Sequence, residues 1–98
     1  MLGLGHGRAQ VQDVEIGATR DGRVLAYKLT VVQDTGAFPR AASVLPFLTR
    51  AMLTGTYDIP NATIEAVSVV TNTVPLVAYR GAGRPEAAAA IERAMDLV

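Results

Sequence analysis

The sequence of 98 residues contains no cysteine and no tryptophan, a single histidine, and no excess of charge of either sign. Without cysteine it can form no disulfide, thiolate nucleophile or Cys-ligated metal site, which fits a reducing compartment and predicts a cytoplasmic location. Nine Lys and Arg balance nine Asp and Glu, so nothing supports a nucleic acid or an anionic membrane as partner. No apolar run approaches the roughly 20 residues that cross a bilayer, and MLGLGHGRAQ at the start lacks the pattern of an export signal.

Side-chain sets that support catalysis or hold metal ions are also missing. His6 has no second histidine to complete a metal site or a catalytic dyad, and a lone histidine near a terminus is more often a surface residue. Ser43 and Ser68 have no histidine base at a recognisable spacing, and Asp34, in QDTGAF, favours ordering a turn over catalysis. The other acids considered lie mostly on predicted solvated faces: Asp13, Glu15, Asp21, Glu86, Glu92 and Asp96. We therefore predict no catalytic residue and no metal ligand in this chain.

The first part of the chain predicts a β-hairpin. Residues 10–19 and 24–33 alternate between apolar and polar side chains, and Asp21-Gly22 between them suits a tight turn because glycine tolerates a positive φ. The apolar face of this hairpin is expected to consist of Val14, Ile16, Ala18, Leu25, Tyr27, Leu29 and Val31.

Two helices and a third strand complete the expected fold of a single domain over residues 1–98. A short helix begins at Ser43 as its cap and ends at Gly55, with Phe47, Leu48, Ala51 and Met52 at helical spacing. Residues 62–73 predict a strand that is buried on both faces along Val67, Val69 and Val70. Residues 85–98 predict a helix whose apolar stripe is Ala87, Ile91, Ala94 or Met95, and Val98.

The order β-β-α-β-α predicts an α+β fold, with helices packed on one face of a small, mostly antiparallel sheet. The last helix has no C-cap glycine, and a sheet of three strands leaves edges that proteins normally cover. We therefore expect the chain to be a fragment of a larger domain, or to associate with a second copy of itself.

The stretch VAYRGAGRPEA, residues 77–87, joins an apolar segment to the last helix. Gly81 and Gly83 allow a close approach of the backbone, the helix begins with free N–H groups, and Arg80 and Arg84 flank the turn with guanidinium groups. This combination predicts a cradle for an anion. The alternative is a purely structural connection, in which glycine allows a tight turn and arginine covers the surface. GAGRPE lacks the third glycine of a dinucleotide fingerprint and the Gly-Lys-Ser/Thr of a P-loop.

The sequence resembles a segment of the large subunit of the molybdenum hydroxylases, the family of xanthine dehydrogenase, aldehyde oxidase and carbon monoxide dehydrogenase-like proteins. Three stretches carry the resemblance: GHGRAQVQDVEIGATRDGRVLAYKLTVVQDTGAF, GTYDIPN and VPLVAYRGAGRPEAAAAIERAMDLV. It covers essentially the whole chain, and AYRGAGRPEA is its specific part. The resemblance implies that this loop lies against a molybdenum–molybdopterin cofactor. By matching position, the cofactor-binding residues would be Tyr79, Arg80, Gly81, Ala82, Gly83 and Arg84.

The family also implies what the chain lacks. The complete parent protein would bind the cofactor and carry out oxidative hydroxylation of an aldehyde or N-heterocycle, with water supplying the oxygen. Its catalytic glutamate, the remainder of the large subunit, and the iron–sulfur and flavin partners lie outside these residues, so the chain alone is expected to bind no cofactor and to be inactive. Gly81 stands where copper-dependent carbon monoxide dehydrogenases carry a cysteine, which argues against that reaction.

Two other hypotheses remain open from the sequence. In the first hypothesis, the chain is a free-standing, non-catalytic binding or structural module that forms a homodimer through its open sheet edge or an apolar surface. A weaker alternative is a small protein that binds a nucleotide phosphate at the same glycine turn.

Overall fold

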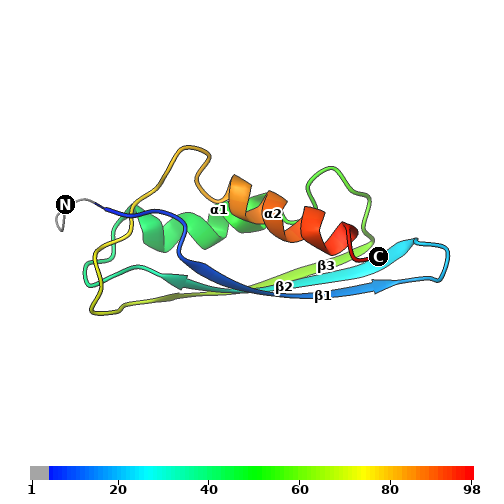
Figure 1. Cartoon of the computed structure of the whole chain (residues 1–98), viewed down its shortest axis with the longest axis horizontal. Coiled ribbons are helices and arrows are strands. Elements are labelled where there is room, and N and C mark those ends of the chain that lie inside the picture. Colours follow the sequence, from blue (N-terminus) through cyan, green and yellow to red (C-terminus); the bar gives the residue numbers. More distant parts are fainter. Residues whose placement is uncertain (1–4) are drawn as a thin grey trace.

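A computed structural model describes residues 5–98 and contains the predicted order of elements. These are β1 (Gln10–Ala18), β2 (Val24–Asp34), a 3₁₀ helix (Ala41–Val44) that leads into α1 (Leu45–Ala51), β3 (Asn61–Val69) and α2 (Arg84–Met95). Both helices lie on the same face of the sheet (Figure 1). The α+β class is therefore confirmed. The expectation that residues 1–10 form no export signal falls partly on residues 1–4, which lie outside the described residues.

The sheet is mixed rather than mostly antiparallel. Its order is β1-β2-β3, with β1 antiparallel to β2 and β3 parallel to β2. The reason lies in the connections. A hairpin reverses the chain direction between β1 and β2, whereas the crossover through α1 brings the chain back to the end of the sheet at which β2 begins, so β3 runs in the same direction as β2. β2 is consequently the central strand, and β1 and β3 form the two edges of the sheet.

The hairpin turn is the one that the sequence predicts. Gly22 has a φ of +84°, and its N–H donates to the carbonyl of Thr19 at 3.0 Å. The N–H of Thr19 donates to the carbonyl of Arg23 at 2.9 Å and closes the loop.

The core lies between the sheet and α2. Tyr27, Leu29 and Val31 point from β2 toward the helix, because alternate residues of a strand share a face. They pack against Ala90, Ile91 and Ala94 of α2, with Val14 and Ile16 of β1 partly buried beside them. The predicted inward faces of the hairpin and of the last helix are thus confirmed at their centres. At their ends the prediction is wrong, because Ala18 and Leu25, near the hairpin turn, and Val98, beyond the end of α2, are exposed.

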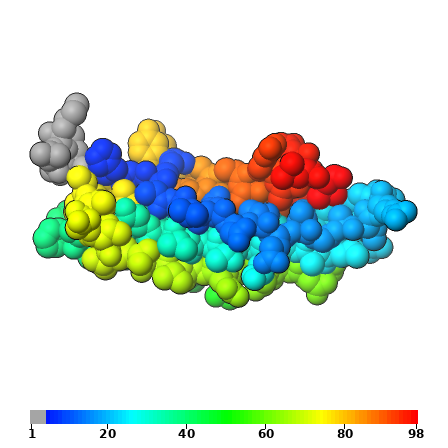
Figure 2. Space-filling view, turned by 60° about the horizontal axis from the view of Figure 1, so that its bottom comes forward, coloured from blue at the N-terminus to red at the C-terminus, as the bar shows by residue number. Residues whose placement is uncertain are grey.

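The prediction that the third strand is buried on both faces is wrong. Val67 and Val70 are exposed by 57% and 62%, and Val69 is also exposed. β3 is an edge strand, and α1 covers only part of its helix-facing side. Figure 2 shows the other face of the sheet, where β1 (blue), β2 (cyan) and β3 (yellow-green) lie side by side with no helix in front of them.

The start of the first helix also differs from the prediction. Ser43 does not cap it: this residue lies in the 3₁₀ helix, and its hydroxyl donates back to the carbonyl of Arg40 at 2.8 Å. The α-helix begins two residues later and ends at Ala51 rather than at Gly55. Leu45 and Thr49 face the interior, whereas Phe47 is 70% exposed and Ala51 and Met52 are also exposed. Neither helix in the described part of the chain has the length and apolar character that crossing a bilayer would need.

Candidate functional site

The candidate site is the turn Tyr79–Arg84, which leads into α2 at Arg84. The segment before it runs beside the first described residues: the N–H of Val77 donates to the carbonyl of His6 at 2.8 Å. His6 therefore contributes a backbone contact, and its side chain is exposed.

Arg8 attaches the N-terminal segment to the candidate turn by two contacts. Its Nη2 donates to the carbonyl of Arg80 at 2.7 Å, and its guanidinium carbon lies 4.9 Å from the centre of the Tyr79 ring. A guanidinium over an aromatic face at this distance is a cation–π contact. Two segments that are far apart in the sequence thus meet at Tyr79 and Arg80, which orders an otherwise exposed turn.

The backbone of the turn is unusual, because three consecutive residues have positive φ values. These are Gly81 at +96°, Ala82 at +28° and Gly83 at +83°. The N–H of Ala82 donates to the carbonyl of Tyr79 at 2.8 Å, and that of Arg84 donates to Gly81 at 3.1 Å. The expectation that the helix begins with free N–H groups is therefore wrong at Arg84, and the amide of Ala82 in the turn is also bonded. The amides of Gly81 and Gly83 donate to no residue in the described range 5–98.

Close packing against α1 requires glycine at position 83. A Cβ at this position would lie 2.7 Å from the Cβ of Leu48, and 2.8 Å from both the carbonyl oxygen of Leu45 and the amide nitrogen of Thr49. Glycine therefore lets the beginning of α2 approach the backbone of α1 closely. This observation favours the structural interpretation of the glycines for Gly83, which is buried.

A hollow of about 380 Å³ lies beside the turn. Its lining comes from the N-terminal segment, β1 and the first turns of α2, and consists of Arg8, Gln10, Gln12, Pro85, Glu86 and Ala89. The Nε2 of Gln12 donates to the Oε1 of Gln10 at 3.0 Å and to the carbonyl of Glu86 at 3.2 Å. Buried polar atoms normally have a partner, yet Nε2 of Gln10 and Oε2 of Glu86 have none among residues 5–98.

Sequence reasoning did not identify this polar lining. Gln10 and Gln12 precede Val14 and Ile16 at the same spacing of two, so the strand period alone indicates that they face the helix. Glu86 is only 9% exposed, whereas the sequence placed it among the solvated acids, and that expectation is wrong. Arg8 lines the same hollow as Glu86, and the side chains of Arg8, Arg80 and Arg84 are exposed.

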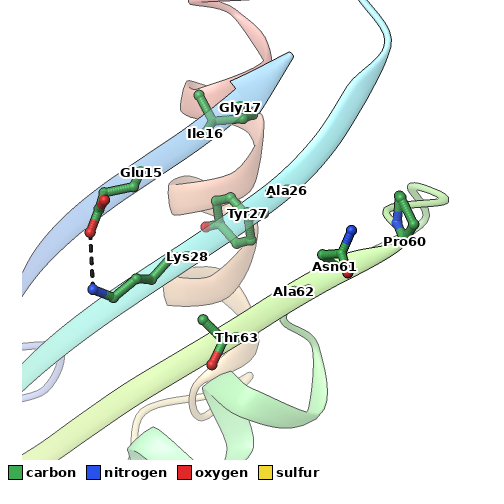
Figure 3. A pocket seen from close by; sticks show the side chains of 10 residues that line it. All are labelled: Glu15, Ile16, Gly17, Ala26, Tyr27, Lys28, Pro60, Asn61, Ala62 and Thr63. Atoms are coloured by element: carbon green, nitrogen blue, oxygen red, sulfur yellow. Dashed lines mark ion pairs between the residues drawn. The ribbon is translucent and has the colours of Figure 1, made fainter. Parts of the chain in front are cut away.

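A larger hollow, of about 610 Å³, lies over the hairpin half of the sheet (Figure 3). At one side of it, the ammonium of Lys28 on β2 and the carboxylate of Glu15 on β1 form an ion pair, with 3.0 Å between the Lys28 nitrogen and the Glu15 oxygen. The hydrogen bond with Glu15 raises the pKa of Lys28, and the charges of Glu15, Glu65 and Asp13 add to the effect. None of the residues Tyr79 to Arg84 lines this hollow, so it is separate from the candidate site.

Asp34 orders a turn, as the sequence predicts. Its Oδ1 accepts hydrogen bonds from Thr71 and from the N–H of Gly36, both at 2.7 Å, and its Oδ2 accepts one from Thr73 at 3.0 Å. The hydrogen bond from Thr71, followed by those from Gly36 and Thr73, lowers the pKa of Asp34 below its ordinary value of 3.8.

Within residues 5–98, no three His, Asp or Glu side chains gather closely enough to hold a metal ion.

Comparison with known proteins gives the site a context. The model of one family, the molybdopterin cofactor-binding domain, matches residues 1–98. A subunit of a bacterial enzyme complex, the 6-hydroxypseudooxynicotine dehydrogenase complex subunit gamma of Paenarthrobacter nicotinovorans, is 36% identical over 100 residues, which cover 99% of this chain and 12% of that protein. The carbon monoxide dehydrogenase large chain of Hydrogenophaga pseudoflava is 40% identical over 90 residues, covering 88% of this chain and 11% of that one.

Solved structures agree with these matches. The aldehyde oxidoreductase of Desulfovibrio gigas superposes with a TM-score of 0.81 at 30% identity, covering 90% of this chain and 10% of that chain. A Cu,Mo-CO dehydrogenase superposes with a TM-score of 0.75 at 34% identity, covering 92% of this chain and 12% of that chain. The chain therefore spans about a tenth of the length of the relatives that it matches.

Proposed function

Since this chain belongs to the molybdopterin cofactor-binding domain family of the molybdenum hydroxylase large subunits, we propose that its turn Tyr79–Arg84 contacts the cofactor in a larger enzyme of that kind. One observation carries the proposal. The turn is an exposed loop flanked by arginines. Its backbone is held in place by Arg8 and by two hydrogen bonds within the turn. Ordered loops of this kind can present donors to a ligand without a further loss of conformational freedom on binding.

The residues of this surface fit an anionic cofactor. Arg80 and Arg84 are exposed and offer planar sets of N–H donors, which match the oxygen atoms of a phosphate. Gly81 carries no side chain and is only partly buried, and its amide has no acceptor in the described range, so the fold leaves this donor unused. When bound, the cofactor would supply the two-electron redox chemistry of molybdenum. The residues of this chain would bind and orient it, with Tyr79 forming part of a pocket wall.

The polar hollow next to the turn supports the same location. Nε2 of Gln10 and Oε2 of Glu86 are a donor and an acceptor without partners in residues 5–98. The side chains that carry these atoms, together with Arg8 and Gln12, make the lining of the hollow polar.

The reaction and the partners belong to the larger enzyme. We propose oxidative hydroxylation of an aldehyde or an N-heterocycle, with the remaining large subunit and with iron–sulfur and flavin partners completing the electron path. The 98 residues are then a fragment of a cofactor-binding subunit and have no activity alone. Gly81 provides no thiolate, so this turn supplies no sulfur ligand for copper.

A chimeric enzyme tests this proposal. The chain replaces the matching segment of the Desulfovibrio gigas aldehyde oxidoreductase, and the molybdenum and pterin contents of the purified protein are measured with its aldehyde-oxidising activity. We expect Arg80→Met to lower the cofactor content or the activity about tenfold or more, because it removes a charge-assisted contact. The matched control is Arg20→Met in the hairpin turn, outside the candidate site. Equal cofactor content and activity in the two variants would contradict the role of the turn.

A further inference from the structure

β3 has a larger share of exposed residues than either of the other two strands of the sheet. Its nine residues pair with β2 on one side only, and β3 ends the sheet. Its sequence, NATIEAVSV, is rich in β-branched residues, a composition typical of a central strand rather than an edge. In Figure 2 the yellow-green atoms of β3 form the lower margin of the molecule. Proteins normally shorten, charge or cover such an edge, because its unpaired N–H and C=O groups attract another strand.

A groove runs along the same edge on the helix side of the sheet. It has a volume of about 420 Å³ and lies between α1 and β3. Pro46, Phe47, Arg50, Ile64, Ala66 and Ser68 line it. The Phe47 side chain is 70% exposed at this groove and gives it an apolar surface. A strand added to β3 would direct every second side chain into the groove.

The opposite face at this edge carries charge. Glu65 of β3 lies in register with Thr30 and, through it, with Asp13 of β1, while Glu15 occupies the neighbouring row. Lys28 is the one cation among these positions, so this part of the face has a net negative charge. The next row, Val11, Val32 and Val67, is apolar and exposed. Side chains that point to this face from an added strand would therefore be basic beside Glu65 and apolar beside Val67.

We propose that β3 accepts one further strand, supplied by a segment of the larger cofactor-binding subunit outside residues 1–98. Its apolar side chains fill the groove at Phe47, and a lysine or arginine faces Glu65. The source of the strand rests on the proposed function, and in the relatives about nine tenths of the polypeptide lies outside the matched segment. A second copy fits less well, because full antiparallel pairing of Asn61–Val69 with itself places Glu65 opposite Glu65.

A probe strand fused to the full chain tests the proposal. Nine residues in which valine and lysine alternate are joined to Val98 by a flexible Gly/Ser linker, which raises the effective concentration of the probe. A second fusion carries glutamate in place of lysine. Hydrogen exchange of the backbone amides of residues 61–69 is measured in both fusions and in the unfused chain. We expect exchange to slow about tenfold in the lysine fusion, and about two- to fivefold less in the glutamate fusion, since surface ion pairs are weak.

The variant Glu65→Lys provides the matched control. It should reverse the preference, so that the glutamate probe protects β3 better than the lysine probe. Identical exchange in the unfused chain and in both fusions would overturn the proposal, as would protection outside β3. Protection of β3 in the unfused chain that grows with protein concentration would assign the edge to a second copy instead. A failed cofactor contact at Arg80 would not change these readings, so the two proposals fail separately.

Discussion

The hydroxyl of Thr49 lies 3.2 Å from the carbonyl oxygen of Gly83 and donates a hydrogen bond to it. Thr49 is fully buried in α1, and Gly83 is the residue that precedes α2. The same carbonyl accepts the N–H of Ala87, the first such bond of the helix. One contact therefore links the position of α1 to the start of α2, and through it to the candidate turn.

Gly83→Ala should destabilise the fold strongly. The new Cβ would meet the backbone of α1 at 2.8 Å, and the residue must keep a φ of +83°. We expect a loss of about 2–5 kcal/mol in the free energy of unfolding, from an unfavourable left-handed conformation and from overpacking. Urea denaturation monitored by circular dichroism measures it.

Gly22→Ala is the matched control for this substitution. Gly22 has nearly the same φ, +84°, but a Cβ there meets nothing within 4 Å. It should cost only the backbone part, about 1–2 kcal/mol. Equal losses in the two variants would show that close approach to α1 does not require glycine at position 83.

Thr49→Val should weaken the link between the helices without changing the packed volume. Valine has the shape of threonine but cannot donate to Gly83 or to Leu45. The Gly83 carbonyl keeps its bond from Ala87, so we expect a loss of only about 0.5–1.5 kcal/mol in urea denaturation. Thr63→Val, on the exposed side of β3, is the control and should change stability by less than about 0.5 kcal/mol. A Thr49→Val protein as stable as the wild type would contradict this role.

The contact between Arg8 and Tyr79 should be measurable as a coupling. A double-mutant cycle with Arg8→Met and Tyr79→Leu separates the cation–π contact from the hydrogen bond of Arg8 to Arg80. We expect a coupling energy of about 0.5–1 kcal/mol in unfolding experiments, since the pair is exposed. Additive single effects, with no coupling, would show that the ring merely lies near the guanidinium.

The pH dependence of stability should include a contribution from Asp34. Its pKa in the folded chain lies below the ordinary 3.8, so its carboxylate adds stability that is complete above that value. This stability is lost as the pH falls through the lower, folded pKa. Thermal unfolding between pH 6 and pH 2 should therefore show a smaller acid-induced loss in Asp34→Asn than in the wild type.

Thr71→Val gives an independent check of the same carboxylate. It removes the hydrogen bond with the largest effect on the pKa of Asp34, which should return toward its ordinary value. Parallel acid-induced losses in the wild type and both variants would mean that Asp34 does not contribute.

Local patterns in the sequence were sufficient for the elements and for most inward faces. The alternation around Val14 and Tyr27 and the helical spacing of Ala87 and Ile91 predicted core positions that the structure confirms. The Asp21-Gly22 turn was equally predictable, because only a few residue types tolerate its backbone angles. The side chain of Asp34 was also placed correctly as a turn-forming group.

Features that depend on neighbours far along the chain were not predictable in this way. Composition suggested a buried third strand, but burial depends on what lies beside it, and β3 is at an edge. Glu86 lies beside Gln12, and Arg8 contacts Tyr79 and Arg80. In each case the two partners are more than 70 residues apart in the sequence. No pattern within a single element indicates such contacts.

The sequence by itself therefore determined the order and type of the strands and helices, where glycine makes the hairpin turn, and which family the chain resembles, since all of these depend on local spacing and residue type. Tertiary structure alone decided that the sheet is mixed, that Arg8 contacts Tyr79 and Arg80, and that Gly83 faces the backbone of α1. The physical reason is that hydrogen bonding and close packing satisfy each group with whichever partner the fold brings near, and that partner is set by topology.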